Sequence, residues 1–163
     1  MRVVAWLTEA TWPAVVDAAR TWVPEAADVT LLYVTGDEPA AAAHGAFAGL
    51  LGRGYRHARD PGSQVEAISA AAAADVLVAA EQRLARSATR LERHGRIERE
   101  VVHAVADAAL LICARDGDPN RLGPHSLAPP TRFVVDHAPC PVLLVWPQPA
   151  PRIDTLPPPP PHP

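Results

Sequence analysis

The chain has 163 residues, of which 48% are hydrophobic and 20% charged, and its formal net charge is −3. This length suits a single domain, and the apolar fraction is too high for a wholly disordered chain. The negative charge balance argues against nucleic-acid binding, and no apolar run approaches the ~20 residues that span a bilayer.

The amino terminus and the cysteines indicate where the protein acts. The apolar run at residues 1–7 is too short for a signal peptide. Cys113 and Cys140 are far apart, and each lies in an apolar stretch, which argues against a disulfide scaffold or a zinc site. We therefore expect a soluble, cytoplasmic protein without a metal site.

The first third of the chain alternates between apolar runs and a helical stretch. Arg2–Leu7 is continuously apolar after its first residue, which is typical of a strand covered on both faces. Val29–Val34 is a second strand of the same kind. Between them, Pro13 at the first turn predicts a helix. Its apolar stripe comprises Val15, Val16, Ala19 and Trp22.

Residues 36–62 form a Gly- and Ala-rich connection with one weak helix predicted over 46–51. Ser63 and Glu66 then have the spacing of a capping box, which predicts the longest helix, ending near Arg93. His94-Gly95 is the expected stop. The inner face of this longest helix is predicted to comprise Val65, Ile68, Val76, Leu77, Leu84 and Leu91. Its arginines at 83, 86, 90 and 93 are predicted to form a solvated face.

The second half of the chain continues the alternation. The charged stretch Arg96–Glu100 predicts an edge strand, because charge there discourages unwanted pairing. A short helix over about 101–108 and an apolar strand, Leu110–Ala114, follow. Thr131–His137 has helical spacing, and Pro141–Trp146 is the last apolar run.

The order of these elements predicts the fold. Strands that alternate with helices, joined by right-handed crossovers, give an α/β fold with a doubly wound, five-stranded parallel sheet and helices on both faces. We place this three-layer, Rossmann-like domain at residues 1–146. Residues 147–163 are predicted to be a Pro-rich, disordered tail without helix or strand.

In such a sheet, ligands bind beyond the carboxyl ends of the strands where the strand order reverses. The candidate segments are 7–11, 34–37 and above all 114–131. Two glycines, two arginines and a helix start in the last segment could hold an anion. An ordinary surface loop is the alternative.

The stretch from Leu110 to Trp146 resembles the carboxyl-terminal signature of the universal stress protein family. The hexapeptide His137-Ala138-Pro139-Cys140-Pro141-Val142 matches that signature letter for letter. The resemblance covers about residues 2–147. It implies a homodimer with five parallel strands in each subunit and, in many members, a bound adenine nucleotide such as ATP or AMP.

The loop departs from the pattern that the resemblance implies, G-x2-G-x9-G-S/T. Arg115, Asp118 and Ala128-Pro129 stand at its key positions, and Leu7 stands at the family's acidic position. The site is therefore either rearranged or lost, and we favour a rearranged site for an anionic ligand. Its expected residues are Leu7, Thr8, Glu9, Val34, Ala114, Arg115, Gly117, Arg121, Gly123, Ser126, Ala128 and Thr131.

Other groupings of reactive residues favour structural roles. Gly49, Gly52 and Gly54 indicate a flexible connection, because no strong strand precedes them. Cys140 is predicted to be a packed thiol rather than a nucleophile paired with His137. Asp118, His125 and Ser126 are too close in the chain to form a hydrolytic triad.

Function follows from the edge strand and the resemblance. An apolar strand at a sheet edge pairs with another chain, so we expect a homodimer through Val142–Trp146. The resemblance implies a stress-response binding or regulatory module rather than a dedicated enzyme, with a signalling partner that the sequence does not name. The alternatives are an adenine-nucleotide hydrolase or transferase, and an adaptor that docks through Pro157–Pro161.

Overall fold

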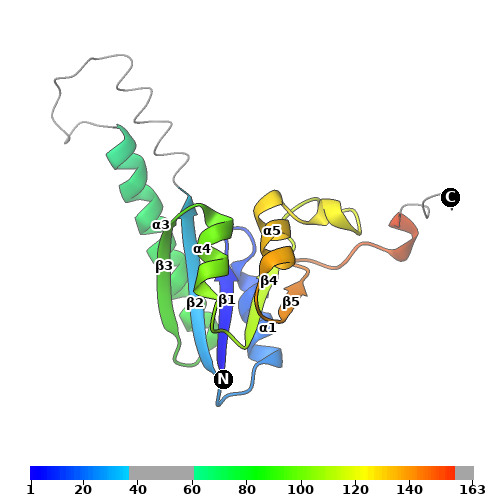
Figure 1. The fold of residues 1–163 in the computed structure, drawn as a ribbon, viewed down its shortest axis with the longest axis horizontal. Coiled ribbons are helices and arrows are strands. Elements are labelled where there is room, and N and C mark those ends of the chain that lie inside the picture. Colours follow the sequence, from blue (N-terminus) through cyan, green and yellow to red (C-terminus); the bar gives the residue numbers. More distant parts are fainter. Residues whose placement is uncertain (37–60, 157–163) are drawn as a thin grey trace.

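The structure is a computed structural model that describes residues 1–36 and 61–156 (Figure 1). The predicted helix over 46–51 and the glycine cluster at 49–54 lie outside these residues, as do the side chains of Ser63, Val65 and Glu66. The principal elements are β1 (Arg2–Leu7), α1 (Trp12–Trp22), β2 (Asp28–Gly36), α3 (Pro61–Leu84), β3 (Thr89–Gly95), α4 (Ile97–Ala104), β4 (Leu110–Ala114), α5 (Pro129–His137) and β5 (Val142–Val145).

The five strands form one sheet in the order β3-β2-β1-β4-β5, and all neighbouring strands are parallel. The chain builds outward from β1 to β3, then returns to add β4 and β5 on the other side of β1. The strand order therefore reverses between β1 and β4. The carboxyl ends of these two strands flank the place where a doubly wound sheet binds ligands.

Residues on alternate sides of β1 enter two separate cores. Val3, Ala5 and Leu7 pack on one face of the sheet, whereas Val4 and Trp6 pack on the other. Since successive side chains in a strand point to opposite faces, a run without polar residues is what two-sided burial requires. The prediction of a strand covered on both faces is confirmed.

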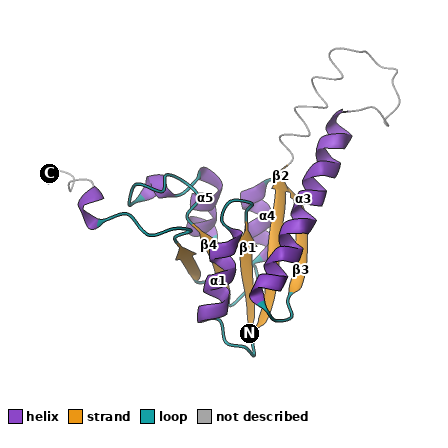
Figure 2. Cartoon of the chain, turned by 180° about the vertical axis from the view of Figure 1, so that it is seen from behind, coloured by secondary structure: helices purple, strands orange, loops and turns teal. Residues whose placement is uncertain are grey.

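Two pairs of helices form the outer layers (Figure 1 and Figure 2). Helices α1 and α3 pack on one face, where Val15, Val16 and Leu77 join the core, and α4 and α5 pack on the other, through Val101 and Val134. The three-layer α/β prediction is confirmed. No helix of the described residues is both long and apolar enough to cross a membrane.

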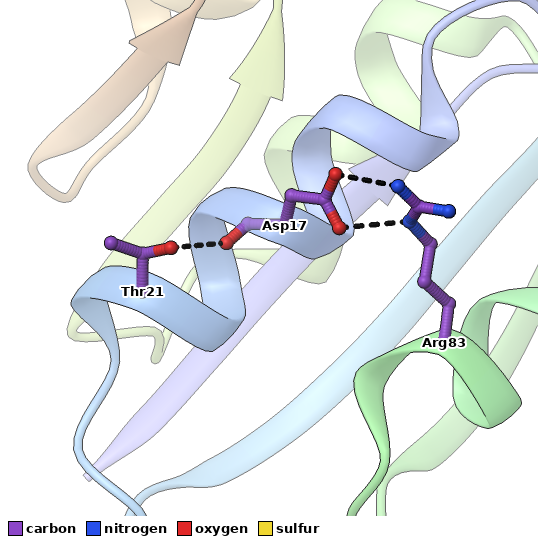
Figure 3. Close-up of polar contacts among 3 residues, drawn as sticks. All are labelled: Asp17, Thr21 and Arg83. Carbon is purple, nitrogen blue, oxygen red and sulfur yellow. Dashed lines mark hydrogen bonds and ion pairs between the residues drawn. The ribbon is translucent and has the colours of Figure 1, made fainter.

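A bidentate ion pair ties α1 to α3 (Figure 3). The Nε and Nη2 atoms of Arg83 donate to the two carboxylate oxygens of Asp17 at 2.8 and 2.7 Å. In the same region of α1, the Thr21 hydroxyl donates to the Asp17 carbonyl oxygen at 2.8 Å. The Arg83 guanidinium lowers the pKa of the Asp17 carboxyl below its ordinary value.

The predicted end of the longest helix is wrong. Helix α3 ends at Leu84, and Ala85 has the left-handed φ of 57°. Arg90, Leu91 and Arg93 lie on β3, which pairs with β2 over seven register positions from Thr89 to Gly95. The predicted solvated face of four helical arginines is therefore wrong, because only Arg83 belongs to α3. Gly95 ends a strand rather than a helix.

The predicted strand Arg96–Glu100 is wrong as well. Helix α4 begins at Ile97, so most of this charged stretch is helical. Glu98 and Glu100 lie in its first turn, where acidic side chains interact favourably with the helix dipole. The charged edge strand exists, but it is β3 and lies one segment earlier.

Two apolar residues that we expected in the core are exposed. Ile68 and Trp22 each keep 70% of their surface accessible. The first turns of α3, which include Ile68, extend beyond the carboxyl end of the sheet in both views (Figure 1 and Figure 2). Trp22 is the last residue of α1. The helical period places both residues on their apolar stripes, but the sheet does not reach the part of α3 that carries Ile68, and Trp22 lies where α1 ends.

The carboxyl-terminal elements differ only at their ends from the prediction. Helix α5 begins at Pro129, two positions before Thr131, and β5 forms the sheet edge opposite β3. Beyond β5, Ile153–Thr155 forms a short 3-10 helix where we expected none. The described part of this tail runs away from the sheet in both views (Figure 1 and Figure 2).

Candidate functional site

Asp116, in the loop after β4, is bonded to the start of helix α5. The amide of Ala128 donates to its Oδ1 at 2.9 Å, and the hydroxyl of Thr131 donates to its Oδ2 at 2.7 Å. Thr131 is 1% exposed, so this contact is sealed from water on one side. The helix dipole favours a negative group at this position. A carboxylate of the chain itself therefore occupies the place where a helix start would bind an anion.

Arg115 is turned toward the loop and the end of β5. Its guanidinium donates to the hydroxyl of Ser126 and lies over the ring of Trp146, 4.8 Å from the ring centroid. Its backbone amide donates to the carbonyl of Val145 at 2.8 Å. The hydroxyl of Ser126 in turn donates to the carbonyl of Gly123 at 2.6 Å. We expected the Arg115 side chain to hold a phosphate, but it instead links the loop to the residue that follows β5.

Gly117 allows the two sides of the loop to touch. Its amide donates to the carbonyl of Ser126 at 3.0 Å, and the amide of Asp118 donates to that of His125 at 2.8 Å. A Cβ atom at Gly117 would lie 2.7 Å from the carbonyl carbon of Ser126, closer than side chains pack. Gly123 has a φ of +92°, which favours glycine. Both glycines thus close the loop on itself.

Arg121 lies on the outside of this loop. It is exposed, and within residues 1–36 and 61–156 no hydrogen bond or ion pair of its side chain is observed. The neighbouring Asp118 caps its own turn, since its Oδ1 accepts from the amide of Asn120 at 2.9 Å. Of the two arginines predicted to hold an anion, Arg121 is the one that faces solvent.

The turn after β1 contributes little charge to the edge. Leu7 is buried in the core, so the acidic position of the family pattern carries no carboxylate here. The hydroxyls of Thr8 and Thr11 bond to each other at 2.7 Å. Glu9 is exposed. Burial and, secondarily, the charges of Glu9 and Glu92 raise the pKa of Tyr33 on β2.

The structure sorts the predicted site residues into three groups. The first is buried in the cores and presents no polar side chain: Leu7, Val34 and Ala114. The second lies at the turn after β1: Thr8 and Glu9. The third belongs to the loop after β4 and the start of α5: Arg115, Gly117, Arg121, Gly123, Ser126, Ala128 and Thr131.

The remaining reactive groups are held in structural contacts. Burial raises the pKa of the Cys113 thiol to about 12, and burial also raises that of Cys140. His137 stacks on Phe133, and its Nδ1 lies 2.8 Å from the Phe133 carbonyl oxygen. Among the described residues, no group of three or more His, Cys, Asp or Glu side chains is arranged to hold a metal ion.

Comparison with known proteins identifies the fold. No protein-family model matches the chain, and no curated protein matches it. Among solved structures, hypothetical protein MJ0577 matches with a TM-score of 0.67 at 14% identity, over 89% of this chain and 94% of the other. The universal stress protein UspA from Lactobacillus plantarum matches with a TM-score of 0.62 at 21% identity, over 88% and 96%.

A universal stress protein in complex with cAMP also matches, with a TM-score of 0.56 at 14% identity over 91% of this chain and 98% of the other. These likenesses show that the chain has the fold of universal stress proteins. The predicted fold is thereby confirmed.

The loop after β4 does not fit a phosphate group in this arrangement. Pro129 and Pro130 have no amide hydrogens to donate at the first two helical positions. The amide of Ala128 and the hydroxyl of Thr131 are bonded to Asp116. A phosphate placed there would meet a carboxylate instead of free donors.

Proposed function

We propose that this protein is a regulatory binding module of the universal stress type, which acts in the cytoplasmic stress response as a homodimer paired through β5. The observation that carries this proposal is the open apolar edge of a sheet that has the universal stress fold. All four residues of β5 are half-buried, although their side chains pack against both cores. An uncovered apolar edge invites pairing with another strand.

The backbone of β5 supports pairing with a second copy. The carbonyls of Pro141 and Val145 accept from the amides of Leu111 in β4 and of Arg115, which directly follows β4, at 2.9 and 2.8 Å. Because the backbone groups of successive strand residues point to opposite sides, those of Val142 and Leu144 point away from β4. These groups are available to the same strand of a partner across a two-fold axis.

Light scattering on the whole protein tests the proposal. We expect a particle of twice the 17.3 kDa chain mass. Leu144→Pro removes one outward amide from β5, so it should yield a monomer with a retained α/β circular dichroism spectrum. The exposed Ile153→Pro variant, placed outside the sheet, is the control and should remain dimeric. A monomeric wild-type protein would contradict the proposal.

The solved cAMP complex of a protein with the same fold favours a second candidate function, the binding of an adenine nucleotide through a rearranged loop. This function would require Asp116 to leave the start of α5. Thermal shift with ATP, AMP and cAMP tests it. Stabilisation of the wild-type protein would support this candidate, release of phosphate would point to a hydrolase, and no shift would support a nucleotide-independent module.

A further inference from the structure

We propose that the carboxylate of Asp116 occupies the anion position at the start of α5 and thereby prevents phosphate groups from binding at the carboxyl end of the sheet. The position itself follows from general rules. A helix start beyond the carboxyl end of a strand, next to the point where strand order reverses, is where parallel sheets hold anions. In this chain both oxygens of one carboxylate already lie there, at 2.9 and 2.7 Å from their donors.

The rest of the loop holds Asp116 in this position. On its amino-terminal side, Arg115 is fixed by Ser126 and by the Trp146 ring. On its carboxyl-terminal side, the amide of Gly117 donates to the carbonyl of Ser126, on the opposite side of the loop, at 3.0 Å. The residues before and after Asp116 are therefore both fixed by contacts of their own. Moving Asp116 away from α5 would disturb the contacts of Arg115 and Gly117 as well.

An incoming phosphate would face two obstacles. It would have to displace the carboxylate from Ala128 and Thr131, because the prolines between them donate nothing. It would also come close to a group of its own sign, which disfavours binding of both charges at one place. Replacing the carboxylate with a neutral amide removes the like charge and weakens the hold of the side chain on the helix start, while the loop length is unchanged.

The test compares wild-type protein with Asp116→Asn in titrations of sodium pyrophosphate and of ATP at constant ionic strength. We expect no wild-type stabilisation beyond that given by sodium chloride. Asp116→Asn should have a lower melting temperature without ligand, because it loses a charged cap. It should bind pyrophosphate at least about tenfold more tightly than the wild type, since the like charge is removed.

Asp118→Asn is the matched control. Asp118 carries the same charge in the same loop, but it bonds only to Asn120 and not to the helix. We expect Asp118→Asn to behave as the wild type in both titrations. An equal gain of binding in both variants would overturn the proposal, because it would reflect the net charge of the loop rather than occupation of the helix start.

Two further outcomes would also overturn it. One is wild-type binding of pyrophosphate or ATP as tight as that of Asp116→Asn; the other is a folded Asp116→Asn that gains no binding. If Asp116→Asn fails to fold, Asp116→Ser supplies a shorter neutral cap for the same comparison. This proposal is independent of the homodimer, because light scattering can show a monomer without any change in the titrations.

Discussion

Gly117 occupies a position where only a hydrogen atom fits between the two sides of the loop. A Cβ atom there would lie 2.7 Å from the carbonyl carbon of Ser126 and 2.8 Å from the amide nitrogen of Leu127. Both are backbone atoms, which cannot move aside by changing a rotamer. The close approach lets Gly117 and Asp118 bond to the opposite side, and so it determines where Asp116 is held.

We therefore expect Gly117→Ala to lower the free energy of unfolding by about 1–3 kcal/mol, the usual range for overpacking. Urea denaturation of the whole protein measures this loss. Asn120→Ala, at an exposed position of the same loop, is the control and should change stability by less than about 0.5 kcal/mol. A Gly117→Ala protein as stable as the control would show that the loop opens at little cost.

The sequence predicted which loop contains the candidate site but not the bond that closes it. Gly117, Ser126 and Thr131 were recognisable from turn chemistry and from the helix start. Asp116 was missed because its two donors lie 12 and 15 residues further along the chain, beyond any local spacing rule. The available signal was the pair of prolines before Thr131, which leaves that helix start short of amides and dependent on a distant cap.

At the scale of elements, burial decides which strands can be recognised. Strand β4 was predicted at its observed bounds, because a strand covered on both faces must be apolar throughout. Strand β3 was missed because an edge strand tolerates charge, so its sequence lacks an apolar run. Its Arg90 forms an ion pair with Glu81 of α3 at 3.2 Å. Its strand character comes from pairing with β2, a long-range contact that overrides local propensity.

Packing of α3 on α1 includes the ion pair between Arg83 and Asp17 (Figure 3). Both side chains are nearly half exposed, so we expect only a small coupling energy between them. A double-mutant cycle with Arg83→Gln and Asp17→Asn, measured by urea denaturation in low and high salt, gives this energy. It should decrease in high salt because exposed charges are screened.

The pH dependence of this pair has a definite sign. Arg83 lowers the pKa of Asp17 in the folded protein, so the folded state binds a proton less readily than the unfolded state. The stabilisation is then complete above the ordinary carboxyl pKa of 3.8 and is lost as the pH falls through the lowered value.

The control for the double-mutant cycle is the pair Arg152–Asp154, in which both side chains are highly exposed. It should show no measurable coupling energy. Equal couplings for the two pairs would contradict the argument.

At the scale of the whole molecule, the sheet has two unlike edges. Strand β3 carries arginines, a glutamate and a histidine, whereas β5 carries only valines and leucines. Charge on an edge strand opposes pairing between chains, and its absence permits pairing. This asymmetry favours the proposed closed dimer through β5 over growth of a continuous sheet.

Amide hydrogen exchange can test this asymmetry directly. The amides of Val142 and Leu144 point away from β4, so pairing of two β5 strands should protect them. We expect their exchange to become faster on dilution, as the dimer dissociates by mass action, while exchange in β3 stays independent of protein concentration. Light scattering on the same samples shows whether the protein dissociates on dilution. If it does, and exchange of the β5 amides still does not change with concentration, the dimer interface lies on another surface.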